Sequence, residues 1–165
     1  RMALDDSGGC DEERFAELHR ELLRYYEAHI AVHSRPFPGV IEALDRLAAL
    51  GVKTAVMTNK LERLARILLA EIGLADRMAA IIGGDTLGPG KAKPSPAPIL
   101  AMIEACGGGR AAFVGDSIYD VMAARGADTV SVEVRFAAVH APAEPLGADH
   151  VIGDYAELVP LLAGL

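Results

Sequence analysis

The sequence predicts an α/β fold in three layers, with a mostly parallel sheet between two layers of helices. Short apolar runs alternate with amphipathic stretches of about ten residues, an alternation typical of right-handed β-α-β units. Of the 165 residues, 52% are apolar and 24% are charged, which suits one globular domain with a substantial core. An all-helical segment gives way to this alternation near residues 35–39, and this change divides the chain into residues 1–35 and 36–165.

The first part is predicted to be helical. Residues 11–31 have the pattern of an amphipathic helix, which Asp11 can cap and whose first turn is acidic. The apolar stripe of this helix comprises Phe15, Leu18, Leu22, Tyr25, Tyr26 and Ile30. The segment Arg-Pro-Phe-Pro-Gly at 35–39 breaks the pattern, and a second helix is expected over 40–50, closed by Gly51.

Strands and helices then alternate to the end of the chain. Apolar runs predict strands over 54–57, 79–82, 111–114, 129–134 and 150–152. Apolar residues at helical spacing predict helices over 61–72, 96–106, 117–125 and 155–162. Pro96 and Pro98 are compatible with a helix only in its first turn, and Pro160 makes the last helix short or kinked.

Polar residues with useful chemistry follow three of these strands. They are Thr58 and Asn59 after the first, Lys91 and Lys93 after the second, and Asp116, Ser117 and Asp120 after the third. Ligands of open α/β sheets bind beyond the carboxyl ends of the strands, so one edge should collect these groups. Carboxylates suit Mg²⁺, and a hydroxyl, backbone N–H groups and a lysine suit phosphoryl oxygens. Phosphoryl transfer needs such positioning and charge neutralisation.

The order of these motifs resembles that of a known family. Thr-Asn-Lys at 58–60, Gly-Gly-Asp-Thr at 83–86 with Lys-Pro-Ser-Pro at 93–96, and Gly-Asp-Ser-x-x-Asp at 115–120 resemble motifs two to four of the haloacid dehalogenase-like hydrolases. The segments at 35–44, 83–86 and 147–154 resemble its phosphoglycolate phosphatase-like branch. The resemblance implies a Rossmann-like core over residues 36–165, with residues 1–35 as the end of a helical cap. It also implies a Mg²⁺-dependent phosphatase of a small phosphorylated metabolite, most simply 2-phosphoglycolate.

The resemblance implies a role for each site residue. Thr58 would donate to the transferring phosphoryl group, assisted by the backbone of Asn59. Lys93 would steady the nucleophile and the phosphate, with Lys91 as a rival for that role. Asp116 would bind Mg²⁺, and Asp120 would support the ion directly or through water. Ser117 would join the substrate-binding residues.

The family's nucleophile motif, D-x-D-x-T, is absent from this sequence. The nearest segment, Leu-Asp-Asp-Ser-Gly at 4–8, has the wrong spacing and no apolar strand before it. In the family the motif lies on a central first strand, between the strand ending at Thr58 and the strand ending at Asp116. Without that strand the sheet would contain a slot of about 10 Å, so we expect the strand and its nucleophile to lie upstream. Residues 1–165 alone are predicted to be inactive.

Several alternatives remain open at this stage. Asp116 and Asp120 could simply begin a helix, and Thr58-Asn59 could be turn chemistry. The protein could be a non-catalytic, phosphate-binding pseudoenzyme, a pyrophosphatase, or a phosphatase of another sugar phosphate. A phosphoacceptor receiver domain is set aside, because its acid pair precedes its Lys-Pro in the chain, whereas here it follows.

Charge and composition limit the partners and the compartment. The net charge of -7 argues against nucleic-acid binding but allows one small anionic substrate. No apolar run approaches the roughly 18 residues of a membrane span, and no signal peptide is visible. Cys10 and Cys106 have no motif spacing and are expected to be free thiols, which favours the cytoplasm. The oligomeric state is not readable from the sequence.

Overall fold

The computed structural model describes residues 8–136 and 146–165. The chain divides into two compact units, Arg1–Ser34 and Arg35–Leu165, and each is described by itself. The assignment of the first unit to a helical cap stays a prediction. The rejected nucleophile segment at 4–8 lies outside the described residues except for Gly8.

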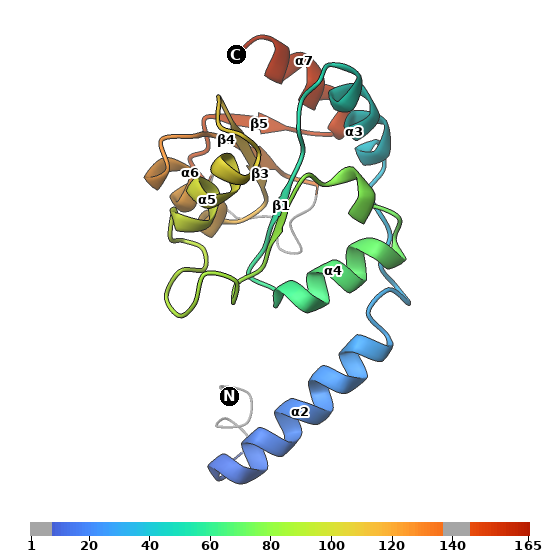
Figure 1. The fold of residues 1–165 in the computed structure, drawn as a ribbon, viewed down its shortest axis with the longest axis vertical. Coiled ribbons are helices and arrows are strands. Elements are labelled where there is room, and N and C mark those ends of the chain that lie inside the picture. Colours follow the sequence, from blue (N-terminus) through green and yellow to red (C-terminus); the bar gives the residue numbers. More distant parts are fainter. Residues whose placement is uncertain (1–7, 137–145) are drawn as a thin grey trace. The chain divides into compact units, whose positions relative to one another are not determined.

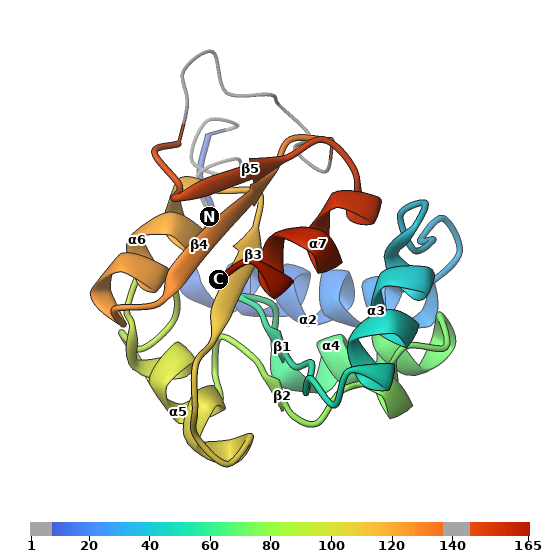
Figure 2. The ribbon, with the colours of Figure 1, turned by 90° about the horizontal axis from the view of Figure 1, so that it is seen from above.

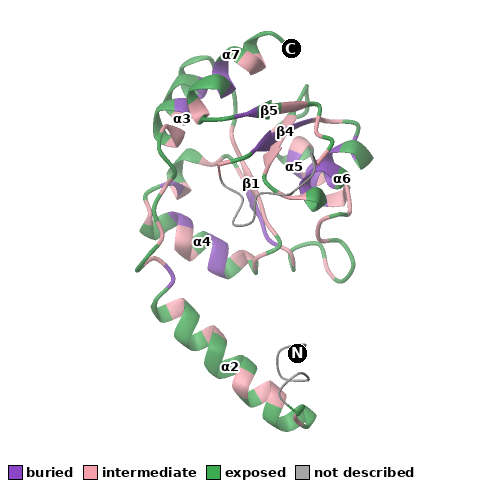
Figure 3. Ribbon diagram, turned by 180° about the vertical axis from the view of Figure 1, so that it is seen from behind, coloured by how far each residue is buried: buried purple, intermediate pink, exposed green. Residues whose placement is uncertain are grey.

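The first unit contains helix α2, Glu12–Ala28. Asp11 caps it as predicted, because its Oδ1 accepts a hydrogen bond from the Arg14 N–H at 2.7 Å. No residue of α2 is buried (Figure 3). Leu22 and Tyr25 of the apolar stripe are 62% and 65% exposed. Of the predicted stripe, Ile30, which follows the helix, is 6% exposed, whereas the stripe residues within α2 are not buried among the described residues.

The second unit alternates helices and strands in the predicted order (Figure 1). Its elements are α3 (Val40–Ala49), β1 (Val56–Met57), α4 (Glu62–Glu71), η1 (Ala75–Arg77), β2 (Ile81–Ile82), α5 (Ala97–Ala105), β3 (Ala112–Gly115), α6 (Ile118–Gly126), β4 (Val130–Val134), β5 (His150–Ile152), η2 (Tyr155–Glu157) and α7 (Leu158–Ala163). No helix in the part of the chain that the structure describes is long and apolar enough to cross a bilayer.

The boundaries predicted for the second unit need two corrections, and in the first unit α2 ends at Ala28, three residues before the predicted end at 31. Strands β1 and β2 have two residues each, paired at Val56↔Ile81 and Met57↔Ile82, although backbone hydrogen bonds between Thr54 and Ala79 and between Thr58 and Ile82 flank the pairs. The last helix begins later than predicted, at Leu158, because Asp154 caps a separate 3₁₀ turn through the Ala156 N–H at 2.6 Å. Pro160 falls in the first turn of α7, where its missing N–H has no helical partner to lose.

All strand pairs are parallel, but they form two separate sheets. Strand β1 pairs with β2, and β3, β4 and β5 form a three-stranded sheet in that order. Among the described residues β1 and β3 are not paired with each other. The division lies between the strand that ends before Thr58 and the strand that ends before Asp116. The family resemblance implied a central strand between these two strands, and its presence stays a prediction.

Helices cover both faces of the three-stranded sheet, so the three-layer α/β prediction is confirmed. On one face Val132 and Val134 pack with α3 and α7, through Ala43, Leu47, Leu158 and Val159. On the other face Phe113 packs against α5 and α6, through Ile99, Ala123 and Ala124. Figure 2 shows β3, β4 and β5 between these two pairs of helices. The carboxyl ends of the strands are left to the loops that carry the predicted site residues.

Candidate active site

Thr58 follows β1 directly and presents a hydroxyl at its carboxyl end. Its N–H donates to the Ile82 carbonyl at 3.0 Å, which continues the pairing of β1 with β2. Its Oγ1 accepts the Lys60 N–H at 3.1 Å, which fixes the turn after the strand. The proton of the hydroxyl is not used in this bond. The hydroxyl of Thr58 can therefore donate to a further acceptor, and its role toward a phosphoryl oxygen stays a prediction.

Asn59 joins the loop after β1 to the loop after β2. Its Oδ1 accepts the Lys93 N–H at 2.9 Å, and its Nδ2 donates to the Lys93 carbonyl at 3.1 Å. The family resemblance implied that the backbone of Asn59 assists Thr58 in binding the phosphoryl group. The structure adds a role for its side chain, which holds the backbone of Lys93 by two hydrogen bonds.

Lys93 reaches from that loop to Asp120 in the first turn of α6. Its Nζ lies 2.6 Å from Oδ1 of Asp120, and the two side chains are only 14% and 6% exposed. The ammonium also lies over the Phe113 ring, 5.6 Å from its centroid. Lys91, the rival, is exposed. The structure therefore pairs Lys93 with the second carboxylate of the site.

Asp120 closes the N-terminus of α6 with its other oxygen. Oδ2 accepts hydrogen bonds from the Ser117 hydroxyl at 2.6 Å, the Ser117 N–H at 2.9 Å and the Asp116 N–H at 3.2 Å. This is a capping box, in which the side chains of Ser117 and Asp120 cap each other's backbone. Gly115 makes room for it, because a Cβ there would lie 2.4 Å from Cγ of Asp120.

Asp116 differs from Asp120 in its surroundings. Its side chain is exposed, and no hydrogen bond or ion pair of its carboxylate is found among the described residues. Burial raises the pKa of the Tyr155 phenol, and the negative charge of Asp116 raises it further. Asp116 therefore has a free carboxylate at the end of β3, within electrostatic reach of Tyr155.

These residues fit the hard oxygen chemistry of Mg²⁺ only in part. Asp116 offers free carboxylate oxygens, whereas both oxygens of Asp120 already accept hydrogen bonds. The structure describes no group of three or more His, Cys, Asp or Glu side chains placed to hold a metal ion. A magnesium ion at Asp116 would need water and other groups for the rest of its coordination, which is usual for Mg²⁺.

The loop after β2 has a structural role, through Asp85 and Thr86. Asp85 Oδ1 accepts the Glu62 N–H at 2.8 Å at the start of α4, and the Thr86 hydroxyl donates to the Glu62 carboxylate. Hydrogen bonds from Thr86, the larger cause, and from Arg66 lower the pKa of Glu62.

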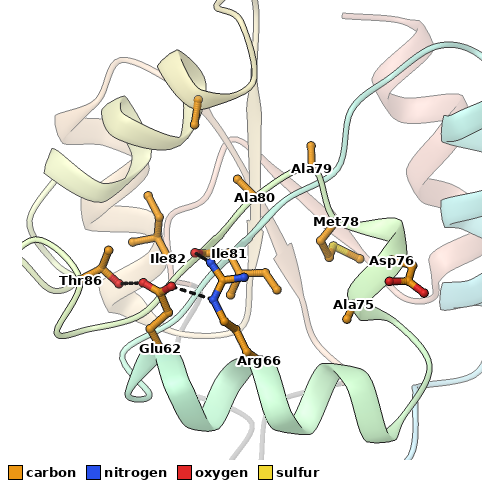
Figure 4. Close-up of a pocket in the computed structure, with 11 residues that line it drawn as sticks. Glu62, Arg66, Ala75, Asp76, Met78, Ala79, Ala80, Ile81, Ile82 and Thr86 are labelled. Carbon is orange, nitrogen blue, oxygen red and sulfur yellow. Dashed lines mark hydrogen bonds and ion pairs between the residues drawn. The ribbon is translucent and has the colours of Figure 1, made fainter.

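A pocket of about 550 Å³ lies next to this loop, beside β2 (Figure 4). Glu62, Arg66 and Thr86 line it; Arg66 and Thr86 both donate to the Glu62 carboxylate, and Arg66 also donates to the Ile81 carbonyl at 3.3 Å. None of the predicted site residues lines this pocket. We therefore place the candidate active site at the three loops and not in this pocket.

Two charged residues near this edge were not predicted from the sequence. Glu133, in the middle strand β4, is 2% exposed and accepts a hydrogen bond from Nε of Arg135 at 3.2 Å. The available signal was a glutamate inside the apolar run Val-Ser-Val-Glu-Val at 130–134, but such a residue also fits a strand with one face in water.

Comparisons with known proteins find the same family that the motifs resemble. The model of the haloacid dehalogenase-like hydrolase family matches residues 4–128. A phosphoglycolate phosphatase of Agrobacterium fabrum is 44% identical over 147 residues, which make up 88% of this chain and 62% of the relative. An N-acetylmuramic acid 6-phosphate phosphatase of Pseudomonas aeruginosa is 31% identical over 156 residues, 92% of this chain and 68% of the relative.

A solved structure shares the fold over nearly the whole chain. It is described as a predicted phosphoglycolate phosphatase from Haemophilus somnus, and it superposes with a TM-score of 0.87 at 27% identity. The match covers 98% of this chain and 72% of the other. The chain spans 62% of the length of the Agrobacterium relative, so these relatives contain sequence beyond the part that matches.

Proposed function

This chain belongs to the haloacid dehalogenase-like hydrolases, and on that premise we propose that it forms part of a Mg²⁺-dependent phosphatase of small phosphomonoesters. The leading substrate is 2-phosphoglycolate, because the Agrobacterium relative is named for it. Another phosphorylated metabolite is the main competitor, since the Pseudomonas relative is named for a sugar phosphate. Two unpaired cysteines are in keeping with a reducing compartment, so we place the activity in the cytoplasm.

One observation carries the proposal: hydrogen bonds connect the three predicted loops without a break. Asn59 holds the backbone of Lys93, the Lys93 ammonium holds Asp120, and Asp120 holds the N–H groups of Asp116 and Ser117. A donor hydroxyl, a cation and a free carboxylate are thereby fixed at the carboxyl ends of β1 and β3. Such positioning is what phosphoryl transfer chiefly requires.

Each residue then has a role in the proposed reaction. The Thr58 hydroxyl donates to a non-bridging phosphoryl oxygen, and the Lys93 ammonium offsets negative charge while Asp120 holds it in place. The Asp116 carboxylate is the Mg²⁺ ligand, and Asp120 supports that ligand through the backbone of its loop. A bound Mg²⁺ would neutralise charge on the phosphoryl oxygens. The contact of Ser117 with the substrate stays a prediction.

The nucleophile is proposed to come from sequence outside these residues. We expect it on a strand between β1 and β3, where it would attack phosphorus and form an aspartyl-phosphate as the alcohol leaves. Water would then hydrolyse this intermediate. One specific observation favours a second candidate, a non-catalytic phosphate-binding protein: the sequence contains no D-x-D-x-T.

A substrate panel on the complete gene product tests the proposal. We expect Mg²⁺-dependent release of phosphate from 2-phosphoglycolate, and no turnover by a purified chain of residues 1–165. A complete protein that binds phosphate but hydrolyses no phosphomonoester with Mg²⁺ would establish the non-catalytic alternative. Turnover by residues 1–165 alone would show that the nucleophile has been placed wrongly.

A further inference from the structure

Glu133 is a buried carboxylate with an incomplete set of partners. It is 2% exposed, and its Oε2 is the one buried side-chain oxygen or nitrogen without a hydrogen bond in the part of the chain that the structure describes. A buried, ionised carboxylate costs free energy unless it is paired and hydrogen-bonded, so such a residue needs an explanation. Its partner is Arg135, through the single Nε–Oε1 bond.

Ser131 provides a comparison on the same face of the same strand. It is 5% exposed, and its hydroxyl bonds both the carboxylate and the N–H of Asp149, at 2.7 and 3.0 Å. The polar group of Ser131 is therefore satisfied inside the fold. Glu133 and Arg135 are not, because Oε2 and the terminal amino groups of Arg135 have no partner among the described residues.

The register of the sheet places Glu133 next to the candidate active site. Glu133 pairs with Gly115, the last residue of β3 before Asp116. Paired residues of parallel strands project to the same face, and the Cβ direction of Gly115 points at the Asp120 carboxylate. Glu133 therefore lies on the same face of the sheet as the Lys93–Asp120 pair, one strand away, and neighbouring strands are about 4.8 Å apart.

Arg135 lies two residues beyond Glu133, on the same face, at the carboxyl edge of the sheet. Its N–H donates to the Ile152 carbonyl at 3.4 Å, so it continues the pairing of β4 with β5 beyond Val134. Its side chain is 56% exposed while its partner is buried. A buried carboxylate thus holds one nitrogen of the guanidinium of a side chain that is largely exposed, at the edge where the substrate is proposed to bind.

We infer that Arg135, held by Glu133, is a specificity-determining residue that binds a second anionic group of the substrate, a carboxylate. A guanidinium binds a carboxylate through paired, charge-assisted N–H bonds. The neighbouring cation, Lys93, is already bonded to Asp120, and Mg²⁺ at Asp116 is proposed to offset the charge of the phosphoryl oxygens. Arg135 supplies the positive charge that a phosphorylated carboxylic acid needs beside its phosphate. This inference rests on the proposed function.

Two substrates that differ only in that group test the inference. On the complete gene product, kcat and KM are measured with 2-phosphoglycolate and with 2-hydroxyethyl phosphate, in which a hydroxymethyl group replaces the carboxylate. The variant is the double substitution Glu133→Val with Arg135→Met, because removing Arg135 alone would strand a buried charge. The control is Arg110→Met, an exposed arginine before β3, at the opposite edge of the sheet.

We expect the wild type to prefer 2-phosphoglycolate and the double variant to lose at least ~10-fold of that preference, through KM and not through kcat. Arg135→Lys, which keeps the charge without the paired geometry, should retain part of it. The control should retain all of it. Equal losses for both substrates, or an unchanged preference, would overturn the inference while leaving the phosphatase in place. A wild type that hydrolyses neither substrate would instead overturn the proposed function.

Discussion

Replacing Asp120 by Asn isolates the contact between Lys93 and Asp120. The two shapes are nearly the same, and the remaining oxygen of Asn can still accept the three hydrogen bonds from Ser117 and Asp116. The amide group would then face the Lys93 ammonium, so two donors would meet where a 2.6 Å ion pair now lies. The substitution thus removes the pair and preserves the cap.

The size of the effect follows from burial. With the two side chains 14% and 6% exposed, water can solvate neither charge well. Removing one partner of a buried pair costs about 3–5 kcal/mol, and the retained capping bonds favour the lower end, about 3 kcal/mol. A pair on the surface would contribute only about 0–1 kcal/mol. The losses of unfolding free energy expected for a buried pair and for a surface pair therefore differ enough for urea unfolding to distinguish them.

Urea unfolding of the complete gene product at pH 7 measures this difference. The wild type, Asp120→Asn, Lys93→Met and the double variant form a double-mutant cycle, in which we expect a coupling of at least ~2 kcal/mol. Asp120→Asn should also lower kcat, because it releases Lys93. A loss of stability below about 1 kcal/mol, with additive single substitutions, would refute the description of a buried, structurally essential pair.

Three further substitutions address the other contacts. Asn59→Ala removes both hydrogen bonds to the backbone of Lys93 and should cost about 1–2 kcal/mol in urea unfolding and lower kcat, whereas Lys91→Ala should change neither. Asp116→Asn should weaken activation by Mg²⁺ strongly; an unchanged Mg²⁺ titration would count against its role as a ligand. Hydrogen bonds from Ser131 lower the pKa of Asp149. The stabilising effect of the Asp149 carboxylate is therefore complete above about pH 4 and is lost as the pH falls through the lower folded-state pKa. Asp149→Asn should flatten the fall of the free energy of unfolding below about pH 4, and an unaltered acid profile would contradict this role of Asp149.

The fold could be predicted from the sequence because the periodicity of its core changes clearly from element to element. Strands β3, β4 and β5 and helices α3 to α6 begin or end within about two residues of their predicted positions, which is usual for boundaries. The two 3₁₀ turns, η1 and η2, were missed. In η2, the Asp154 side chain accepts a hydrogen bond from the Ala156 N–H. This local contact competes with helix formation and leaves no periodic signal in the sequence.

The convergence of the site residues was also predictable, because it depends only on which strand each one follows. The bonds within the site were not. Nothing in the sequence shows that the Asn59 side chain holds Lys93, or that Asp120 uses both its oxygens inside the protein. These contacts depend on distances between loops that are 34 and 27 residues apart in the chain. The metal-ligand role predicted for both acids stays a prediction, with Asp116 the one whose carboxylate is free.

Glu133 shows where periodicity fails in principle. The alternation Val-Ser-Val-Glu-Val in β4 separates two faces of a strand correctly, since the valines pack with α3 and α7. It does not tell whether the polar face meets water or a second layer, because both give the same period of two. In this fold α5 and α6 cover the second face, and Ser131 and Glu133 are buried there. Placing a polar residue on a solvated face costs little free energy, whereas burying it under a second layer costs much more. The consequence of Glu133 therefore depends on the helices that cover its face. For that reason a residue that looked unremarkable in the sequence leads, in the structure, to the strongest inference about substrate choice.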